Sequence, residues 1–335
     1  MTRNTSIRRG PLGKSSDTLE VRVRAQNVMV RALIAILLAA SLSPVARAET
    51  PLSYAASGHV TAPTLVDGRG PFAFVFDTGA EGSAVYATFA REQGLSPLPA
   101  RHERLQGQTG AASFPLTRLA SLGVDGRQAG DIEAVILPDR ADGVALAGIV
   151  GLDLMGRFVV ALDPSRHRLA LHPPDTSARR VGGRGLAATK AMRLGGGLLG
   201  LPVTINGATG VAVLDTGARD SRINLRFAGA AGLGAGLADL PDDGVIQGAT
   251  NMAVATKRAR LGTVEFAGVR RSNVDTRVVD LAVFEALGLA DRPAMILGMD
   301  LLSDLRLVID FPKGVVWIGQ GGGGESARAP SAKVR

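Results

Sequence analysis

The chain contains no cysteine among its 335 residues. Without thiols it forms no disulfide, no Cys-ligated metal site and no Cys nucleophile, so its fold must be held by burial alone. Aromatic residues are also scarce, at 4% beside 46% hydrophobic residues overall. This composition indicates a globular protein whose cores are built from Val, Leu, Ile and Ala rather than from rings.

The apolar run near the N-terminus is too short to span a membrane. ALIAILLAASL at residues 32–42 has 11 residues, whereas a membrane helix needs about 20. Arg31 precedes the run, and small residues follow at Ala46 and Ala48. These features predict a signal peptide over residues 1–48, with Met29 as a candidate for the true start. We expect an exported protein, periplasmic or secreted, with no stable membrane insertion after leader cleavage; anchoring through an uncleaved leader is the alternative.

The positive charge of the chain is concentrated in this leader. The first 48 residues carry eight Lys or Arg against two Asp or Glu, so six of the eight net positive charges belong to them. The remainder has no basic stripe interleaved with aromatic residues. Nucleic acid is therefore not an expected partner.

The sequence Asp-Thr-Gly-Ala occurs twice, beginning at Asp77 and at Asp215. Each copy follows an apolar run that reads as the second strand of a β-hairpin, with Asp67-Gly68 or Asn206-Gly207 as the predicted turn. A short helix ending in Gly-Leu, a Gly-rich hairpin and an apolar-apolar-Gly element follow in the same order in both copies. The sequence therefore predicts an internal duplication.

The duplication divides the chain into two related lobes. We expect an N-terminal lobe at 50–175 and a C-terminal lobe at 190–320. Segment 176–189 has the Gly, Arg and Ser bias of a linker, and 321–335 that of a disordered tail.

A pair of aspartates, one from each lobe, is suited to hydrolysis of a peptide bond. Without a metal, a Cys or an activated Ser, water must be deprotonated while the carbonyl is protonated, and two carboxylates that share one proton can do both. Asp77 and Asp215 are therefore the predicted catalytic residues. Two further pairs are predicted to support their geometry: Gly79 and Gly217, which allow a close backbone approach, and Thr78 and Thr216, which can hydrogen-bond across the lobes.

With these motifs the chain resembles the aspartic protease superfamily, most closely the bacterial retropepsin-like aspartyl proteases. Its DTGA resembles the retroviral form of the motif, and the apolar-apolar-Gly elements ending at Gly151 and Gly298 match as well. The resemblance implies a mainly β, bilobal fold with two retropepsin-like β-barrel lobes in one chain. It also implies a monomer acting as an intramolecular pseudo-dimer on a peptide or protein substrate, with no cofactor and no metal. Pairing of lobes between two chains is the alternative.

The Gly-rich hairpin of each lobe is expected to form a flap over the substrate. The flap candidates are Gln108, Thr109, Thr250 and Asn251. Pepsin-like flaps carry a tyrosine, and this chain has none in either flap segment. Two hypotheses therefore stay open: an exported aspartic endopeptidase, and a catalytically weak or inactive peptide-binding module on the same duplicated fold.

Smaller expectations concern the surroundings of the motifs. Because Ala80 and Ala218 carry no hydroxyl to stabilise an ionised carboxylate, we expect an activity optimum at about pH 5 to 7 rather than about 2.

Four further residues are expected to lie at the ends of helices. Ser83 and Ser221 would begin the helix after each motif, and Asp153 and Asp300 would cap the closing helices.

Overall fold

The computed structural model describes Met1, residues 49–234, residue 238 and residues 240–320. The predicted leader beyond Met1 and the predicted tail lie outside these described residues. Within them, the strands form three sheets, so the chain is mainly β, as the resemblance implied. None of the helices in this part of the chain has the length and apolar character needed to cross a bilayer.

The N-terminal sheet has the strand order β2-β3-β4-β9-β5-β8-β7-β6. An additional pairing of β3 with β7 closes six of these strands into a barrel. The elements of this lobe are β2 (Ser53–Tyr54), β3 (Val60–Val66), β4 (Arg69–Phe76), β5 (Ala84–Tyr86), α2 (Ala87–Glu92), β6 (Pro97–Gly107), β7 (Gly110–Val124), β8 (Arg127–Leu137), β9 (Gly148–Val150) and α3 (Leu152–Met155).

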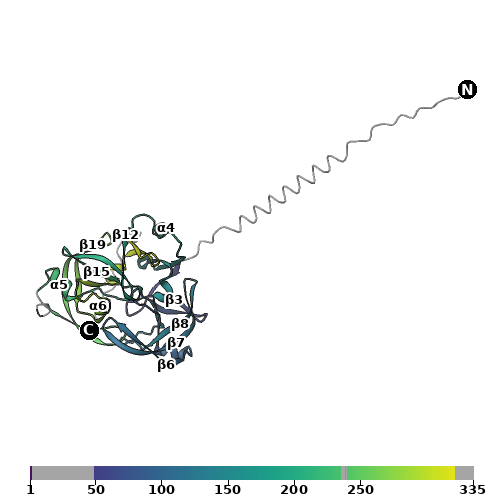
Figure 1. The fold of residues 1–335 in the computed structure, drawn as a ribbon, viewed down its shortest axis with the longest axis horizontal. Helices are drawn as coiled ribbons and strands as arrows, with labels where there is room; N and C mark the ends of the chain where they lie inside the picture. The colour runs from purple at the N-terminus through teal and green to yellow at the C-terminus, as the bar shows by residue number, and fades with distance from the viewer. Residues whose placement is uncertain (2–48, 235–237, 239, 321–335) are drawn as a thin grey trace. The chain divides into compact units, whose positions relative to one another are not determined.

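The C-terminal sheet repeats this topology strand for strand, in the order β13-β14-β15-β20-β16-β19-β18-β17, with β14 paired to β18. The elements of this lobe are β13 (Met192–Arg193), η2 (Gly195–Gly197), β14 (Leu199–Ile205), β15 (Ala208–Leu214), β16 (Arg222–Ile223), α5 (Leu225–Ala230), β17 (Asp242–Gln247), β18 (Ala253–Phe266), β19 (Val269–Val278), α6 (Ala282–Ala286), β20 (Ala294–Leu297) and α7 (Met299–Leu302). In Figure 1, β3, β6, β7 and β8 group on one side of the ribbon, and β15, β19 and α5 on the other. The predicted duplication is confirmed.

A third sheet joins the two halves, in the order β1-β11-β10-β21-β22-β12. Its elements are β1 (Thr50–Pro51), β10 (Val159–Asp163), η1 (Pro164–Arg166), β11 (Arg168–His172), α4 (Ala178–Gly182), β12 (Ala187–Lys190), β21 (Leu305–Asp310) and β22 (Val315–Gln320). Strand β10 pairs antiparallel with β21, so strands from both halves share this sheet. The predicted linker 176–189 contains α4 and most of β12, which occupies the position equivalent to β1. The predicted boundaries of the lobes stay predictions.

The hairpin before each motif has the predicted turn. Asp67 and Gly68 have φ angles of 50° and 73°, and Asn206 and Gly207 have φ angles of 49° and 88°. Positive φ at both central residues matches the right-handed twist of the paired strands, which is why Asp-Gly and Asn-Gly are favoured there. The second strand of each hairpin leads directly into the motif aspartate.

The core is aliphatic, as the composition predicted. One apolar cluster of buried side chains extends from Leu52 to Ile318 and includes residues of all three sheets. Phe72 and Phe74 pack edge-on against Phe89 of α2, which anchors that helix on the N-terminal barrel. The two lobes are therefore packed together rather than merely tethered.

The predicted start of the helix after each motif was wrong. The N-cap of α2 is Tyr86 and that of α5 is Asn224, whose side chain accepts a hydrogen bond from Phe227 N. Ser83 and Ser221 lie upstream of these positions because a short strand, β5 or β16, separates the motif from the helix. A local pattern of apolar residues does not reveal such a strand.

Each of these serines instead binds the aspartate of the closing helix. The backbone N and Oγ of Ser83 donate to Asp153 at 2.8 and 2.7 Å, and those of Ser221 donate to Asp300 at 2.9 and 2.7 Å. The N-cap of each closing helix is the glycine before it, so neither aspartate is the N-cap residue, although Asp153 Oδ1 accepts a hydrogen bond from Leu154 N in the first turn at 2.8 Å. These bonds fasten the loop after each motif to α3 or α7.

Candidate active site

Each motif aspartate stands at the end of a strand and is held there by a neighbouring strand. Asp77 follows β4, and its backbone N donates to Val150 O at 3.1 Å. Asp215 follows β15, and its backbone N donates to Leu297 O at 3.1 Å. The acceptors belong to the apolar-apolar-Gly elements, so these elements position the aspartates.

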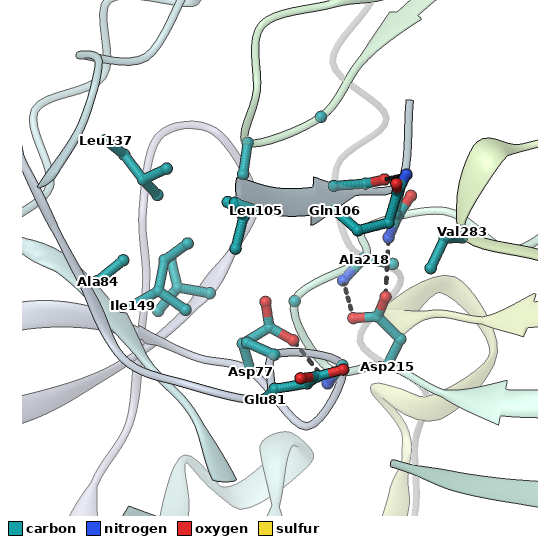
Figure 2. Close-up of a pocket in the computed structure, with 18 of the residues that line it drawn as sticks. Asp77, Glu81, Ala84, Leu105, Gln106, Leu137, Ile149, Asp215, Ala218 and Val283 are labelled. Atoms are coloured by element: carbon teal, nitrogen blue, oxygen red, sulfur yellow. Dashed lines mark hydrogen bonds between the residues drawn. The ribbon is translucent and has the colours of Figure 1, made fainter. Parts of the chain in front are cut away.

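The structure brings the two carboxylates together. Gly79 lies against the opposite carboxylate, because an ideal Cβ on it would be 2.5 Å from Asp215 Cγ, and Gly217 approaches Asp77 more closely still. Gly79 N donates to Asp77 Oδ1 at 2.7 Å, and Ala218 N donates to Asp215 Oδ1 at 2.8 Å (Figure 2). Any side chain on either glycine would occupy the place of a carboxylate.

The two threonines exchange hydrogen bonds across the lobes. Thr78 Oγ1 donates to Leu214 O at 2.9 Å and accepts from Thr216 N at 3.1 Å. Thr216 Oγ1 donates to Phe76 O at 2.6 Å and accepts from Thr78 N at 3.0 Å. Both threonines are buried, so these bonds have no competition from water.

The surroundings of the two aspartates differ. Burial raises the pKa of Asp77 well above its ordinary value, and the nearby charge of Asp215 raises it further. Burial also raises the pKa of Asp215, but the N–H of Ala218, the charge of Arg222 and the amide of Gln108 favour its ionised form. These surroundings favour the ionised form more at Asp215 than at Asp77.

The tips of the two predicted flap hairpins meet. Thr109, in the turn between β6 and β7, accepts a hydrogen bond through Oγ1 from Gly248 N at 3.2 Å. Thr250 packs on Gly107, where an added Cβ would be 2.9 Å from Thr250 Cγ2. Thr109 and Thr250 are both buried, and they hold the tips against each other.

Each hairpin tip also reaches the opposite lobe. Gln108 Nε2 donates to Asp215 Oδ2 at 2.8 Å, and Asn251 Nδ2 donates to Asp139 O at 3.2 Å. Gln108 and Asn251 line the cleft, so these two are the flap candidates that face it. In this structure the Gln108 amide lies directly on one of the two carboxylates.

The cleft has a volume of about 960 Å³ and contains both carboxylates. Its wall beside Asp77 is apolar and includes Ala84, Leu105, Leu137 and Ile149 (Figure 2). Arginines from the C-terminal lobe also line the cleft: Arg219, Arg222 and Arg277. In the described part of the chain, no group of three or more His, Asp or Glu side chains forms an arrangement that could hold a metal ion.

Arg222 was missed by the sequence analysis. Its side chain is 7% exposed, and its Nη1 donates to Gln108 Oε1 at 2.8 Å, so it supports the amide that contacts Asp215. A signal was available in the sequence, because Arg222 and Ala84 each stand seven residues after a motif aspartate. Comparison of the two copies residue by residue would have found this difference.

Comparison with protein families agrees with the duplicated topology. The family described as "gag-polyprotein putative aspartyl protease" matches residues 62–157. The family described as "Aspartyl protease" matches residues 201–301. No curated protein sequence matches the chain. Each family match contains one Asp-Thr-Gly-Ala motif and its apolar-apolar-Gly element, and the chain therefore belongs to the aspartic proteases, as a retropepsin-like protein with two lobes.

Proposed function

We propose that the chain is an aspartic endopeptidase that hydrolyses peptide bonds with water activated by Asp77 and Asp215. The observation that carries the proposal is the unequal pair of adjacent carboxylates. Asp215 receives hydrogen bonds from Ala218 N and Gln108 Nε2, whereas burial and a neighbouring negative charge keep the proton on Asp77. One member is thus suited to be the base and the other the acid.

The reaction follows from these protonation states. Asp215 takes a proton from water as the water oxygen bonds to the scissile carbonyl carbon, and Asp77 gives its proton to the carbonyl oxygen. The resulting tetrahedral diol collapses when Asp215 returns its proton to the leaving nitrogen and the C–N bond breaks. Asp77 recovers a proton from a diol hydroxyl, so the pair ends as it began.

The attacking water needs a place beside Asp215. Because the Gln108 amide occupies Asp215 Oδ2 in this structure, the hairpin of β6 and β7 must shift before the water can bind there. We propose that an extended substrate enters the cleft below the hairpin tips and displaces this amide. The volume of about 960 Å³ supports the binding of several residues on both sides of the scissile bond.

We propose further that the protein acts as a monomer after export to the periplasm or beyond the cell. Both aspartates and both threonines of the site come from one chain, which supports an intramolecular pseudo-dimer. The predicted leader supports export. Size measurement by light scattering tests the first point, since an obligate exchange of lobes between chains would double the mass.

The contact between Gln108 and Asp215 also favours a second candidate function, a peptide-binding module without turnover. A binder would hold peptides and transition-state analogues with similar affinity, whereas an active pair binds the analogue at least about 100-fold more tightly. A calorimetric titration with a pepstatin-type analogue and with a plain peptide of matched sequence separates the two.

The decisive experiment is cleavage of a peptide library between pH 3 and 8 by the parent, Asp77→Asn and Asp215→Asn. Each substitution should lower kcat/KM at least about 100-fold, because each removes one of the two proton-transfer groups. Asp291→Asn is the matched control, since that carboxylate is exposed and remote from the cleft. Cleavage that survives either of the first two substitutions would rule out the shared pair.

A further inference from the structure

We propose that Arg222 forms a substrate subsite for a carboxylate, so that the enzyme prefers peptides with a Glu or Asp close to the scissile bond on the Asp215 side. The proposal rests on the proposed function, because it names the substrate class of the same cleft. Four observations carry it: the position of Arg222 in the duplicated fold, its lack of a direct ion pair, its distance from Asp215 and its link to Gln108.

The duplicated fold identifies the counterpart of Arg222. In the N-terminal barrel, Ala84 pairs with Val135 of β8 and lies opposite Ile149 of β9. In the C-terminal barrel, Arg222 makes the same pairings with Arg277 of β19 and with Ile296 of β20. Two apolar wall positions of one half are therefore arginines in the other.

Ala84 lies in an apolar cluster of the N-terminal lobe. Ala84 belongs to a cluster of buried side chains that faces the cleft beside Asp77, and Figure 2 shows three of them together, Ala84, Leu137 and Ile149. The members of the cluster are Val75, Ala84, Tyr86, Leu116, Val135, Leu137 and Ile149. Charged residues of the N-terminal lobe, among them Arg104 and Arg140, also line the cleft, but the wall around Ala84 is suited to apolar side chains, so an arginine at the equivalent position marks a different specificity.

The charge of Arg222 is balanced only at a distance, because Asp220 and Asp215 act on it electrostatically without a direct ion pair. Arg277, its neighbour on β19, is paired with Asp220 and Asp243 at 2.9 Å each. Arg222 makes no ion pair in the described part of the chain, and its buried Nε has no hydrogen-bond partner. A buried cation without a directly bonded carboxylate is costly to the fold. A substrate carboxylate that enters as the hairpin of β6 and β7 shifts would supply this partner.

The unused edge of the guanidinium has the geometry for this task. Nη1 is engaged by Gln108, whereas Nε and Nη2 donate no hydrogen bond to any described residue. These two donors lie on one edge of a planar group and match the two oxygens of a carboxylate. A phosphate group would fit the same donors, but a Glu or Asp side chain is the form a peptide substrate supplies.

The distance to the catalytic pair sets where the acidic residue must stand. The hydrogen bonds from Gln108 to Asp215 and from Arg222 to Gln108 are both 2.8 Å long and share one amide. Arg222 Nη1 therefore lies within about 8 Å of Asp215 Oδ2, which equals about two residues of an extended chain. The acidic residue belongs within two positions of the scissile bond.

The link through Gln108 adds a consequence for turnover. A carboxylate bound at the Nε and Nη2 edge draws the guanidinium towards the substrate and so weakens the Nη1 bond to Gln108 Oε1. Loss of that bond leaves the amide free to leave Asp215 Oδ2, the place where the attacking water must bind. An acidic substrate thus helps to uncover the base, so the preference should be visible in kcat as well as in KM.

The test uses pairs of peptides that differ only by Glu or Gln, with the pair placed in turn at each position within three residues of the cleaved bond. For the parent protein we expect kcat/KM at one or two positions to be at least about tenfold higher for Glu, as for other buried charge-assisted contacts. Equal values for Glu and Gln at every position would overturn the proposal, and this result needs no variant.

Variants then assign the preference to Arg222. In Arg222→Met the Glu-to-Gln ratio should fall towards 1, and in Arg222→Lys part of it should remain, because the charge is kept and the fork is lost. Arg226→Met is the matched control, an exposed arginine outside the cleft, and it should keep the parental ratio. An unchanged ratio in a folded Arg222→Met, judged by its thermal melt, would refute the assignment.

A binding measurement separates failure of this inference from failure of the proposed function. The parent is titrated by calorimetry with uncleavable Glu and Gln peptides that carry a reduced bond. Tighter binding of the uncleavable Glu peptide, together with no cleavage of the ordinary Glu and Gln peptides, supports the subsite and refutes the endopeptidase. Cleavage with no difference between Glu and Gln supports the endopeptidase and refutes the subsite.

Discussion

Thr78 and Thr216 each donate a hydroxyl to the strand end of the opposite lobe and each accept the other's backbone N–H. The separation of the two catalytic candidates is therefore set by backbone groups one residue away from each of them. The long side chains of the cleft are not needed to hold the pair together.

Replacing either threonine with valine should destabilise the protein. Thr78→Val would leave Leu214 O and Thr216 N buried without partners, at a cost of about 2 to 4 kcal/mol in the free energy of unfolding. Thr78→Ser keeps the hydroxyl and should cost much less. Urea denaturation compares the two variants, and equal stabilities would mean that these bonds do not hold the lobes.

The activity should follow a bell-shaped pH profile that lies above the ordinary titration range of aspartate, near pH 4. At low pH the activity falls as Asp215 takes up a proton, and at high pH it falls as Asp77 loses one. Burial raises the pKa of both groups, so both limbs move to higher pH, in the direction expected from Ala80 and Ala218. The check is kcat/KM from pH 2 to 9, and a maximum at about pH 2 would contradict it.

Asp77→Asn should stabilise the fold at neutral pH while it abolishes cleavage. Because the pKa of Asp77 is raised in the folded state, the folded protein binds more protons than the unfolded chain between about pH 4 and the raised value. The stability of the parent therefore decreases as the pH rises through that window, and the variant avoids this loss. We expect a gain on the order of 1 kcal/mol at pH 8 and none at pH 3.

Thermal melts across this pH range measure the difference. Asp291→Asn should show no such dependence, because that carboxylate is exposed. A constant difference between Asp77→Asn and the parent at all pH values would indicate that the ionisation of Asp77 is not the cause.

Gln108→Met should move the acidic limb of the activity profile to higher pH. The amide of Gln108 favours the ionised form of Asp215, so its loss raises the pKa of Asp215 and the base is protonated at higher pH than in the parent. Gln128→Met is the control, an exposed residue of β8 outside the cleft. If the acidic limb of Gln108→Met lies at the same pH as that of the parent, the amide has already left Asp215 in the state whose titration this limb reports.

Gly217→Ala should inactivate the enzyme at least about 100-fold, because the new methyl group would displace the Asp77 carboxylate by more than the tolerance of the reaction. Gly229→Ala, within α5 and with open space around it, should keep the activity and slightly raise the stability. Parallel measurement of cleavage and melting temperature distinguishes the two. Full activity of Gly217→Ala would mean that the two carboxylates are not adjacent in solution.

The duplication and the candidate pair could be predicted because they are written in the sequence as repeated local patterns. The turns at Asp67-Gly68 and Asn206-Gly207 depend on residues that tolerate positive φ, and the position of Asp77 and Asp215 depends on the strands that precede them. Both are properties of short segments.

The remaining features depend on contacts between distant segments. No local pattern reveals that Gln108 reaches Asp215, that Ser83 binds Asp153, or that residues of the predicted linker form β12 beside β22. Arg222 is an intermediate case. Alignment of the two copies shows an arginine where the other copy has Ala84, but only the structure shows that this arginine is buried beside Gln108.

The difference between Ala84 and Arg222 makes the two halves of the cleft chemically distinct. A cleft between two identical lobes would bind a peptide equally well in two opposite orientations. Every substitution in such a pair of lobes would appear in both halves of the cleft. Here the halves are encoded separately, with an apolar wall beside Asp77 and a buried cation beside Asp215. With the proposed subsite at Arg222, a substrate with one apolar and one acidic flank would fit this cleft in a single orientation, so only one order of the two flanks along the peptide would be accepted.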